Sequence, residues 1–256
     1  MAFKYQYICS ALIMIVFQSC AVPERNFTIE GHLILLDSLN VEYTDTVQEA
    51  IILTYKEKLD DEMNRVLVKS EHVMEKGTPE GLLNNYVADL VLERGNQLYQ
   101  PQDGNPIDFC LLNYGGLRVP LPKGEVTSSR VFELLPFENE MVVVTLDGVS
   151  TNELFNYLAN ATRGMPVAGI RLEIKDNKPK TIFIKDQPFN LNRNYKILTS
   201  DYLADGGDNM NFFLQPLNYE LLGMKVRDAI ILHMEETQEK GEKISSRLDG
   251  RISVVL

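Results

Sequence analysis

The chain has 256 residues, of which 45% are hydrophobic and 24% charged, so it is long enough to bury a sizeable core without covalent or metal staples. Its 36 acidic residues against 25 basic ones leave a formal net charge of −11, and no stripe of Lys or Arg offsets this excess locally. Polymeric nucleic acid is therefore excluded as an expected partner, because proteins bind it mainly by neutralising phosphates. A small anion held by one or two arginines remains compatible with the composition.

The N-terminal residues predict a targeting segment. Residues 8–17 form an apolar run that is too short to span a bilayer but suits a signal peptide. The sequence Phe17-Gln-Ser-Cys20 resembles the lipobox of bacterial lipoproteins, in which cleavage precedes a cysteine that is then acylated. We therefore expect residues 1–19 to be a lipoprotein signal peptide, Cys20 to be lipidated and residues 20–45 to be a tether, in a protein anchored in the bacterial cell envelope and facing the periplasm or the surface. Plain secretion with cleavage elsewhere is the alternative.

Residues 46–256 are predicted to form one domain that begins with two helices. Thr46-Val-Gln-Glu49 has the pattern of a capping box, and apolar residues at every fourth position from Val47 to Met63 predict a long helix. A second helix is predicted with Thr78 as its cap, Pro79 in its first turn and Gly95 at its end. Its expected buried face consists of Leu82, Leu83, Tyr86, Val87, Leu90 and Val91.

The remainder of the chain mixes short strands and helices. Its patterns predict strands at 107–112, 141–146, 195–199 and 252–256, a hairpin of 169–175 with 180–185, and helices at 127–135, 150–164 and 224–239. Because the strands and helices do not alternate regularly, we expect an α+β fold with a mixed β-sheet and packed helices. Cys110 lies in an apolar run and is expected to be an unpaired core residue.

The loop around residues 201–208 is rich in aspartate and glycine, which raises the question of a metal site. The three histidines of the chain are far apart, whereas zinc and dinuclear phosphoesterase sites use clustered histidine and carboxylate ligands. An EF-hand loop that begins at Asp201 would place Leu203 and Phe212 where oxygen ligands are needed. Phosphate-binding and nucleophile-elbow motifs are also missing from the sequence. No metal or cofactor is therefore expected on this chain.

A binding constellation remains. Asn113 and Arg118 flank one pair of glycines, and Tyr202 and Asp208 flank another, while Phe137 follows Leu-Leu-Pro. Glycines let the backbone approach a ligand, an aspartate can accept two ribose hydroxyl groups, and two aromatic rings can enclose a flat base. Stacking is worth about 1 to 3 kcal/mol per base and a charge-assisted hydrogen bond about 1.5 to 3 kcal/mol, which is enough for micromolar binding. Each residue also has a structural interpretation as a core aromatic, a turn residue or a surface ion pair.

Four segments resemble a known family in their order along the chain: LLNYGGLR (111–118), ELLPFEN (133–139), LDGVSTNELF (146–155) and YKILTSDYLADGGD (195–208). They are similar to the C-terminal domain of the bacterial 5′-nucleotidase and UDP-sugar hydrolase family, and LLNNYVADLVL (82–92) resembles the GNLxxDA helix of that family. The resemblance covers about residues 50–256 and implies the fold of a 5′-nucleotidase C-terminal domain.

The resemblance also implies the residues that bind substrate. In that family the C-terminal domain binds the nucleoside, and a separate N-terminal metallophosphoesterase domain holds two metals and cleaves the phosphate. The implied contacts are Asn113, Gly116 and Arg118 of the NxGGxR motif, Phe137 and Tyr202 as a stacking pair, and Asp208 as the acceptor of ribose hydroxyl groups. The sequence departs from the family pattern at Tyr114, where Gly is frequent, and in residues 77–83, which lack the arginines that help to hold phosphate.

Together, these features predict the substrate-recognition half of a split 5′-nucleotidase-type phosphohydrolase in nucleotide catabolism or scavenging. We expect its ligand to be a nucleoside or nucleotide, and its partner a separate metallophosphoesterase chain that carries the divalent metals, so that no catalytic residue lies here. One alternative is a stand-alone, lipid-anchored protein that binds nucleosides or nucleotides without an enzyme partner. Another is a structural or interaction lipoprotein whose pocket no longer binds ligand.

Overall fold

The computed structural model describes residues 30–33, 45–161 and 163–255, so the predicted signal peptide, Cys20 and most of the predicted tether lie outside the described residues. The chain divides into two compact units, Met1–Ile51 and Ile52–Leu256, and the second contains the sheets and the site described below. Among the described residues, no helix is both long and apolar enough to cross a membrane.

The described elements include helices of very different length. The α-helices are α2 (Thr46–Asn64), α3 (Leu82–Leu98), α4 (Ser128–Leu134), α5 (Gly148–Asn160), α6 (Asp201–Ala204) and α7 (Val226–Glu239), and the 3-10 helices are η1 (Tyr114–Gly116), η2 (Gly207–Asn209) and η3 (Asn211–Phe213). The strands are β1 (Val66–Ser70), β2 (Phe109–Leu111), β3 (Gly124–Thr127), β4 (Glu140–Leu146), β5 (Val167–Ala168), β6 (Ile170–Lys175), β7 (Lys178–Ile184), β8 (Gln187–Pro188), β9 (Tyr195–Ser200), β10 (Asn218–Lys225), β11 (Lys243–Ile244) and β12 (Ile252–Val254).

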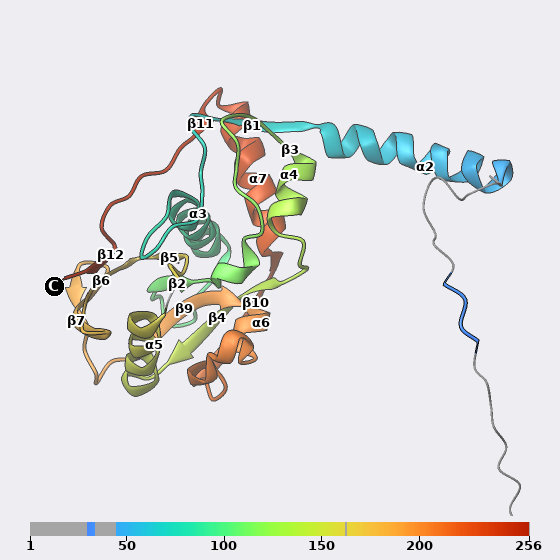
Figure 1. Cartoon of the computed structure of the whole chain (residues 1–256). Helices are drawn as coiled ribbons and strands as arrows, with labels where there is room; N and C mark the ends of the chain where they lie inside the picture. The colour runs from blue at the N-terminus through green and yellow to red at the C-terminus, as the bar shows by residue number, and fades with distance from the viewer. Residues whose placement is uncertain (1–29, 34–44, 162, 256) are drawn as a thin grey trace, which may run out of the picture. The chain divides into compact units, whose positions relative to one another are not determined.

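The described strands form three sheets, with the orders β11-β1-β3, β10-β4-β9-β2-β5 and β12-β6-β7-β8. In the five-stranded sheet, β2 runs parallel to β9, whereas β4 runs antiparallel to it. Figure 1 shows α5 and α3 on opposite sides of this sheet. The predicted α+β fold with a mixed sheet and packed helices is therefore confirmed.

Strand alternation divides the interior into two hydrophobic clusters. On β2, Cys110 packs with residues of α3 and α7, whereas Phe109 and Leu111 pack with α5 on the other face. Neighbouring strands repeat the division, because Met141 and Val143 join the α3 side and Val142 and Val144 the α5 side. Successive side chains of a strand point to opposite faces, so a central sheet needs apolar residues at every position.

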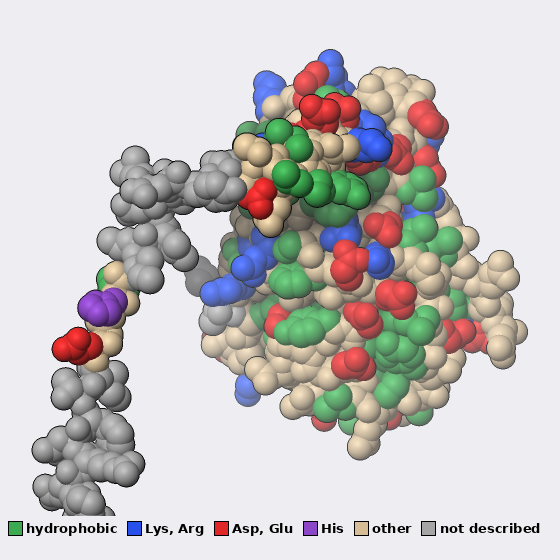
Figure 2. All heavy atoms as spheres, turned by 90° about the vertical axis from the view of Figure 1, so that its right-hand side faces the viewer, with side chains coloured by type: hydrophobic (Ala, Val, Ile, Leu, Met, Phe, Trp, Pro, Cys, Tyr) green, Lys and Arg blue, Asp and Glu red, His purple; other side chains and the backbone are tan. Residues whose placement is uncertain are grey.

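The surface carries the acidic excess of the sequence. Figure 2 shows Asp and Glu side chains spread over the face in view, with Lys and Arg side chains among them. Many described basic groups are paired with carboxylates, including Arg171 with Asp186 and Lys196 with Asp103. Such ion pairs place Lys and Arg side chains among the carboxylates of this acidic surface.

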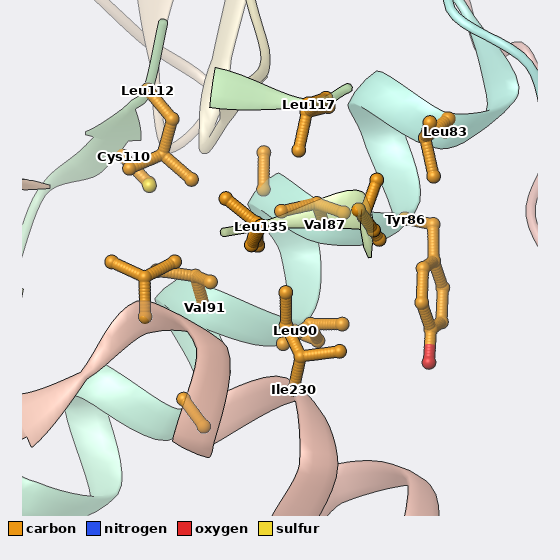
Figure 3. Close-up of a cluster of buried hydrophobic side chains, with 14 of the residues drawn as sticks. Leu83, Tyr86, Val87, Leu90, Val91, Cys110, Leu112, Leu117, Leu135 and Ile230 are labelled. Carbon is orange, nitrogen blue, oxygen red and sulfur yellow. The ribbon is translucent and has the colours of Figure 1, made fainter. Parts of the chain in front are cut away.

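Helix α3 supplies much of the cluster drawn in Figure 3, where its apolar side chains meet Cys110 of β2 and Ile230 of α7. The predicted apolar face is confirmed, since Leu83, Tyr86, Val87, Leu90 and Val91 are buried and Leu82 is half-buried. Cys110 is free and buried, as predicted, and burial raises the pKa of its thiol. Full burial of one such side chain contributes about 1.5 to 3 kcal/mol.

The ends of α3 differ from the prediction. The helix begins at Leu82 after Gly81, and Thr78 instead accepts a hydrogen bond at 3.1 Å from the backbone N–H of Gly164. The helix also continues through Gly95 to Leu98, because Gly95 packs closely on β9: a Cβ there would lie 2.5 Å from Leu198 Cδ2. Gly95 is thus a packing residue and not a helix stop.

Two further predicted helix starts are wrong, because an aspartate just upstream of Thr46-Val-Gln-Glu49 and of Ser150-Thr-Asn-Glu153 caps each helix. Asp45 Oδ1 accepts from the backbone N–H of Val47 at 3.0 Å, and Asp147 Oδ1 accepts from that of Ser150 at 2.7 Å. Helix α5 therefore begins at Gly148 and ends at Asn160, before the predicted stop. The apolar stripe predicted on α2 exists, but none of its residues is buried.

Candidate functional site

Strand register brings the predicted contacts to one edge of the five-stranded sheet. Cys110 of β2 lies opposite Leu198 of β9 in a parallel pair, and Met141 of β4 lies opposite Ser200 of β9 in an antiparallel pair. The segment after β2, the segment after β9 and the segment before β4 therefore share an edge. These segments are 113–118, 201–208 and 137–139, which are far apart in the sequence.

The NxGGxR segment forms η1 and a short turn after β2. Asn113 precedes η1, and its side chain lies over Gly116, where a Cβ would be 2.7 Å from Asn113 Oδ1. Arg118 is exposed; its Nη1 donates to Gly115 O at 3.4 Å, and its Cζ lies 6.0 Å from the centre of the Phe137 ring. Asn113, Gly116 and Phe137 also line one small cavity of about 20 Å³, with room for about one water molecule.

Phe137 is 46% exposed and lies in a loop that charged residues hold in place. Buried Arg227 donates to Leu135 O at 3.2 Å and pairs with Glu138, which also pairs with Lys225. These hydrogen bonds, that of Lys225 first, hold the pKa of Glu138 at about 2, below its usual range. The Phe137 ring is therefore presented to solvent on an anchored loop.

Tyr202 and Asp208 are joined directly. The Tyr202 hydroxyl donates to Asp208 Oδ1 at 2.9 Å, and the hydroxyl oxygen of Tyr202 accepts from the backbone N–H of Asp208 at 3.3 Å. The hydrogen bond to Asp208 raises the pKa of Tyr202. Among the described residues, none donates to Asp208 Oδ2, so half of the carboxylate stays available.

The glycines of this loop set the position of the tyrosine ring. A Cβ on Gly207 would lie 2.6 Å from Tyr202 Cζ, so the ring rests against the backbone at that residue and is 43% exposed. Asp208 has a φ of 52°, in the left-handed region. One side of the ring is therefore covered by the chain itself.

A second cavity of about 510 Å³ adjoins this loop. Its lining consists of Asn156, Tyr157, Asn160, Ala161, Arg163 and Met165. The Tyr157 hydroxyl donates to Asp208 O at 3.1 Å, and Met165 Sδ accepts from the backbone N–H of Tyr114 at 3.4 Å. Two residues that line the cavity thus form hydrogen bonds to the two glycine segments, and the cavity has the size of a small-molecule site.

The sequence analysis missed several residues at this edge. Tyr157 belongs to the predicted helix at 150–164, whose apolar pattern is carried by the buried neighbours Leu154, Phe155 and Leu158 and gave no reason to single it out. Lys76 and Arg163 both approach Tyr114, but a single basic residue before a helix and another before a strand form no motif. Within the described ranges, no group of three or more His, Cys, Asp or Glu side chains is arranged to hold a metal ion.

Comparisons with known proteins all point to one protein family. The profile of the family described as "5'-nucleotidase, C-terminal domain" matches residues 62–215. A trifunctional nucleotide phosphoesterase protein of Bacillus subtilis is 28% identical over 200 residues, which cover 72% of this chain and 13% of that protein. A 5'-nucleotidase of Vibrio parahaemolyticus is 31% identical over 109 residues, which cover 40% of this chain and 19% of that protein.

Solved structures agree on the fold. A 5'-nucleotidase precursor from Thermus thermophilus has a TM-score of 0.67 at 22% identity, over 82% of this chain and 43% of that one. The NAD nucleotidase of Haemophilus influenzae has a TM-score of 0.61 at 17% identity, over 83% of this chain and 42% of that one. The chain therefore spans less than half the length of each of these relatives.

Proposed function

Because the chain belongs to the family of 5′-nucleotidase C-terminal domains, we propose that it recognises the nucleoside or nucleotide substrate of a 5′-nucleotidase-type phosphohydrolase, in nucleotide catabolism or scavenging. One observation carries the proposal: two half-exposed aromatic rings, Phe137 and Tyr202, lie at the same sheet edge as Asp208, whose Oδ2 accepts from no described residue.

The proposed recognition follows from the chemistry of these groups. The base stacks on the exposed faces of Phe137 and Tyr202, and a ribose hydroxyl donates to Asp208 Oδ2. Asn113 supplies an amide that lies beside Gly116, because the missing Cβ of Gly116 leaves room for the Asn113 side chain. Stacking at about 1 to 3 kcal/mol per base and a hydrogen bond to a charged group at about 1.5 to 3 kcal/mol together support micromolar affinity after the cost of association.

We propose that phosphate cleavage takes place on a separate metallophosphoesterase chain, which would carry the divalent metals. In support, the relatives named above are phosphoesterases and nucleotidases by name, and this chain matches less than half of each. Under this proposal the residues of this chain bind and orient the substrate and take no part in bond breaking.

The test has a binding arm and a rate arm. Calorimetric titration of the purified chain with adenosine and uridine should show saturable binding, and the chain should increase AMP hydrolysis by a metallophosphoesterase encoded beside it. Binding without any effect on the rate would favour the alternative of a stand-alone nucleoside-binding protein. If the titration gives no heat at millimolar ligand and the rate of AMP hydrolysis does not change, both proposals are refuted.

The site of action is part of the same proposal. We propose that Cys20 is acylated and holds the protein on the cell envelope, because Phe17-Gln-Ser-Cys20 follows an apolar run typical of a signal peptide. In a bacterial host, radiolabelled palmitate should label the wild-type chain and leave a Cys20→Ser variant unlabelled. Equal labelling of both chains would exclude Cys20 as the attachment site.

A further inference from the structure

A third cavity lies between α3, α7 and the segment that joins β11 to β12. Its volume is about 390 Å³, which is within the range of small-molecule sites. Helix α3 contributes Tyr86 and Glu93 to its lining, α7 contributes His233, and the segment before β12 contributes Arg247. Its lining shares no residue with either of the two cavities at the candidate nucleoside site, so it is a separate feature of the domain.

Most of the charged side chains that line this cavity pair with one another. Arg251 forms ion pairs with Asp89 at 2.7 Å and with Asp249 at 2.8 Å. Arg247 and Glu93 differ, because neither forms an ion pair with any residue that the structure describes. The Glu93 carboxylate accepts from a side-chain amide one turn further along α3, at 3.3 Å. The cavity is therefore lined by one positive and one negative side chain that each lack an oppositely charged partner among the described residues.

These two unpaired charges approach the cavity from different ends. The backbone of Arg247 is held on α3, because its carbonyl oxygen accepts from Asn85 Nδ2 at 2.8 Å. Glu93 lies about two turns further along α3, roughly 12 Å along the helix axis. The long Arg247 side chain covers part of this distance. The remaining gap suits a small molecule whose own two charges lie close together.

Neutral polar groups also line the cavity. The Tyr86 hydroxyl is buried without a hydrogen-bond partner among the described residues, and Figure 3 shows it pointing away from the apolar side chains of the cluster. Burial raises the pKa of Tyr86, so the hydroxyl stays protonated. The His233 and Tyr86 ring centres lie 6.1 Å apart, and burial lowers the pKa of His233. At neutral pH its imidazole is therefore uncharged and has one donor and one acceptor nitrogen.

We propose that this cavity binds an α-amino acid in its zwitterionic form. Arg247 pairs with the carboxylate of the ligand, Glu93 pairs with its ammonium group, and that ammonium group also donates to the uncharged His233 ring. A zwitterion offsets both side-chain charges, whereas a simple anion or cation would leave one of them unpaired. Leu90 and the Tyr86 ring supply apolar surface for a nonpolar ligand side chain. The inference does not depend on the proposed function.

The lining favours a zwitterion over a metal ion or a phosphate group. Within the described ranges, no group of three or more His, Cys, Asp or Glu side chains is arranged to hold a metal ion. The carboxylates of the lining, from Asp89, Glu93 and Asp249, outnumber its guanidinium groups, from Arg247 and Arg251. A phosphate group would therefore meet an excess of negative charge.

Calorimetric titration of the purified chain with leucine, methionine and phenylalanine tests the proposal. At least one of them should bind at a single site. Leucine is then compared with leucinamide, which lacks the carboxylate, and with 4-methylpentanoate, which lacks the ammonium group. Each should bind at least about tenfold more weakly than leucine, as the loss of one charge-assisted contact would give. No heat with any of the three amino acids at millimolar concentration would overturn the proposal.

Two variants assign the two charges of the ligand. Arg247→Met should weaken leucine binding about tenfold and abolish the difference between leucine and leucinamide. Glu93→Gln should weaken it similarly and abolish the difference between leucine and 4-methylpentanoate. Both side chains are exposed, so the variants should fold, which thermal melting checks. If both differences persist in the variants, these residues are not the charge partners and the proposal is wrong.

Helix α4 offers matched controls, because Arg130 and Glu133 are paired with each other there at 2.9 Å, outside the cavity. Arg130→Met and Glu133→Gln remove the same charges and should leave leucine affinity unchanged. An equal loss in the cavity variants and the control variants would reduce the effect to net charge and overturn the proposal.

Competition separates this inference from the proposed function. Saturating adenosine should leave leucine binding unchanged, since the two cavities share no lining residue; displacement of leucine by adenosine would refute the assignment to this cavity. If leucine binds as described and adenosine does not bind at all, the amino-acid site stands and nucleoside recognition is refuted.

Discussion

Truncation of Phe137 to alanine should weaken nucleoside binding while lowering the free energy of unfolding only modestly, because the ring is partly exposed. The side chain is 46% exposed, so about half of its burial contribution of about 1.5 to 3 kcal/mol is lost in the Phe137→Ala variant, or roughly 1 kcal/mol. A loss of that size lowers the melting temperature of a domain of this length by about 2 to 4 °C. The lost stacking of about 1 to 3 kcal/mol per base lowers nucleoside affinity by about 5- to 150-fold.

Phe183 of β7 offers a matched control for this variant. It is half-buried, and Arg171 Cζ lies 5.7 Å from the centre of its ring, much as Arg118 lies near Phe137. Phe183→Ala should lower the melting temperature by a similar amount and leave adenosine affinity, measured by calorimetry, unchanged. Unchanged affinity in Phe137→Ala, or an equal loss in both variants, would refute the role of Phe137 as a stacking surface.

Three further predictions concern the Tyr202–Asp208 pair and the loop that carries Phe137. Tyr202→Phe frees Asp208 Oδ1, so calorimetry should show adenosine bound about two- to tenfold more tightly, with 2′,3′-dideoxyadenosine unaffected; weaker adenosine binding would contradict this. Gly207→Ala places a Cβ 2.6 Å from Tyr202 Cζ and should weaken adenosine binding by displacing the ring, whereas full affinity would show that the ring position is unimportant. Because the pKa of Glu138 is held at about 2, below its ordinary value of 4.5, its ion pairs contribute stability above about pH 4.5 that is lost as pH falls toward 2. The melting-temperature difference between wild type and Glu138→Gln should therefore shrink over that range, and a constant difference would contradict the assignment.

The sequence predicted the helices and strands of the core well, because the spacing of apolar residues along the chain matches the positions that are buried in the structure. The predicted hairpin of 169–175 with 180–185 corresponds to β6 and β7, and Asp176 and Asn177 of its turn have positive φ, at 51° and 55°. β10, by contrast, was missed, because its residues are exposed or half-buried and lack the apolar pattern of a central strand. Helix ends were predicted least well, since Asp45 and Asp147 cap helices that a downstream capping box also fits.

The candidate site was predictable only in part. Asn113, Arg118, Phe137, Tyr202 and Asp208 could be singled out because glycine pairs and family motifs mark them. Lys76 and Arg163 lie near the Tyr114 ring only because the loops before α3 and β5 pack around it, and no local sequence pattern encodes that packing. The hydrogen bond from Tyr202 to Asp208 also requires the left-handed turn between them.

Calorimetric titration of adenosine into the purified chain would show whether this domain binds a nucleoside. The proposed stacking surfaces and the free oxygen of Asp208 predict saturable binding at one site with micromolar affinity, and a marked loss of affinity in a Phe137→Ala, Asp208→Ala double variant that still melts cooperatively. Absence of binding at millimolar adenosine, or an unchanged affinity in the double variant, would contradict the account.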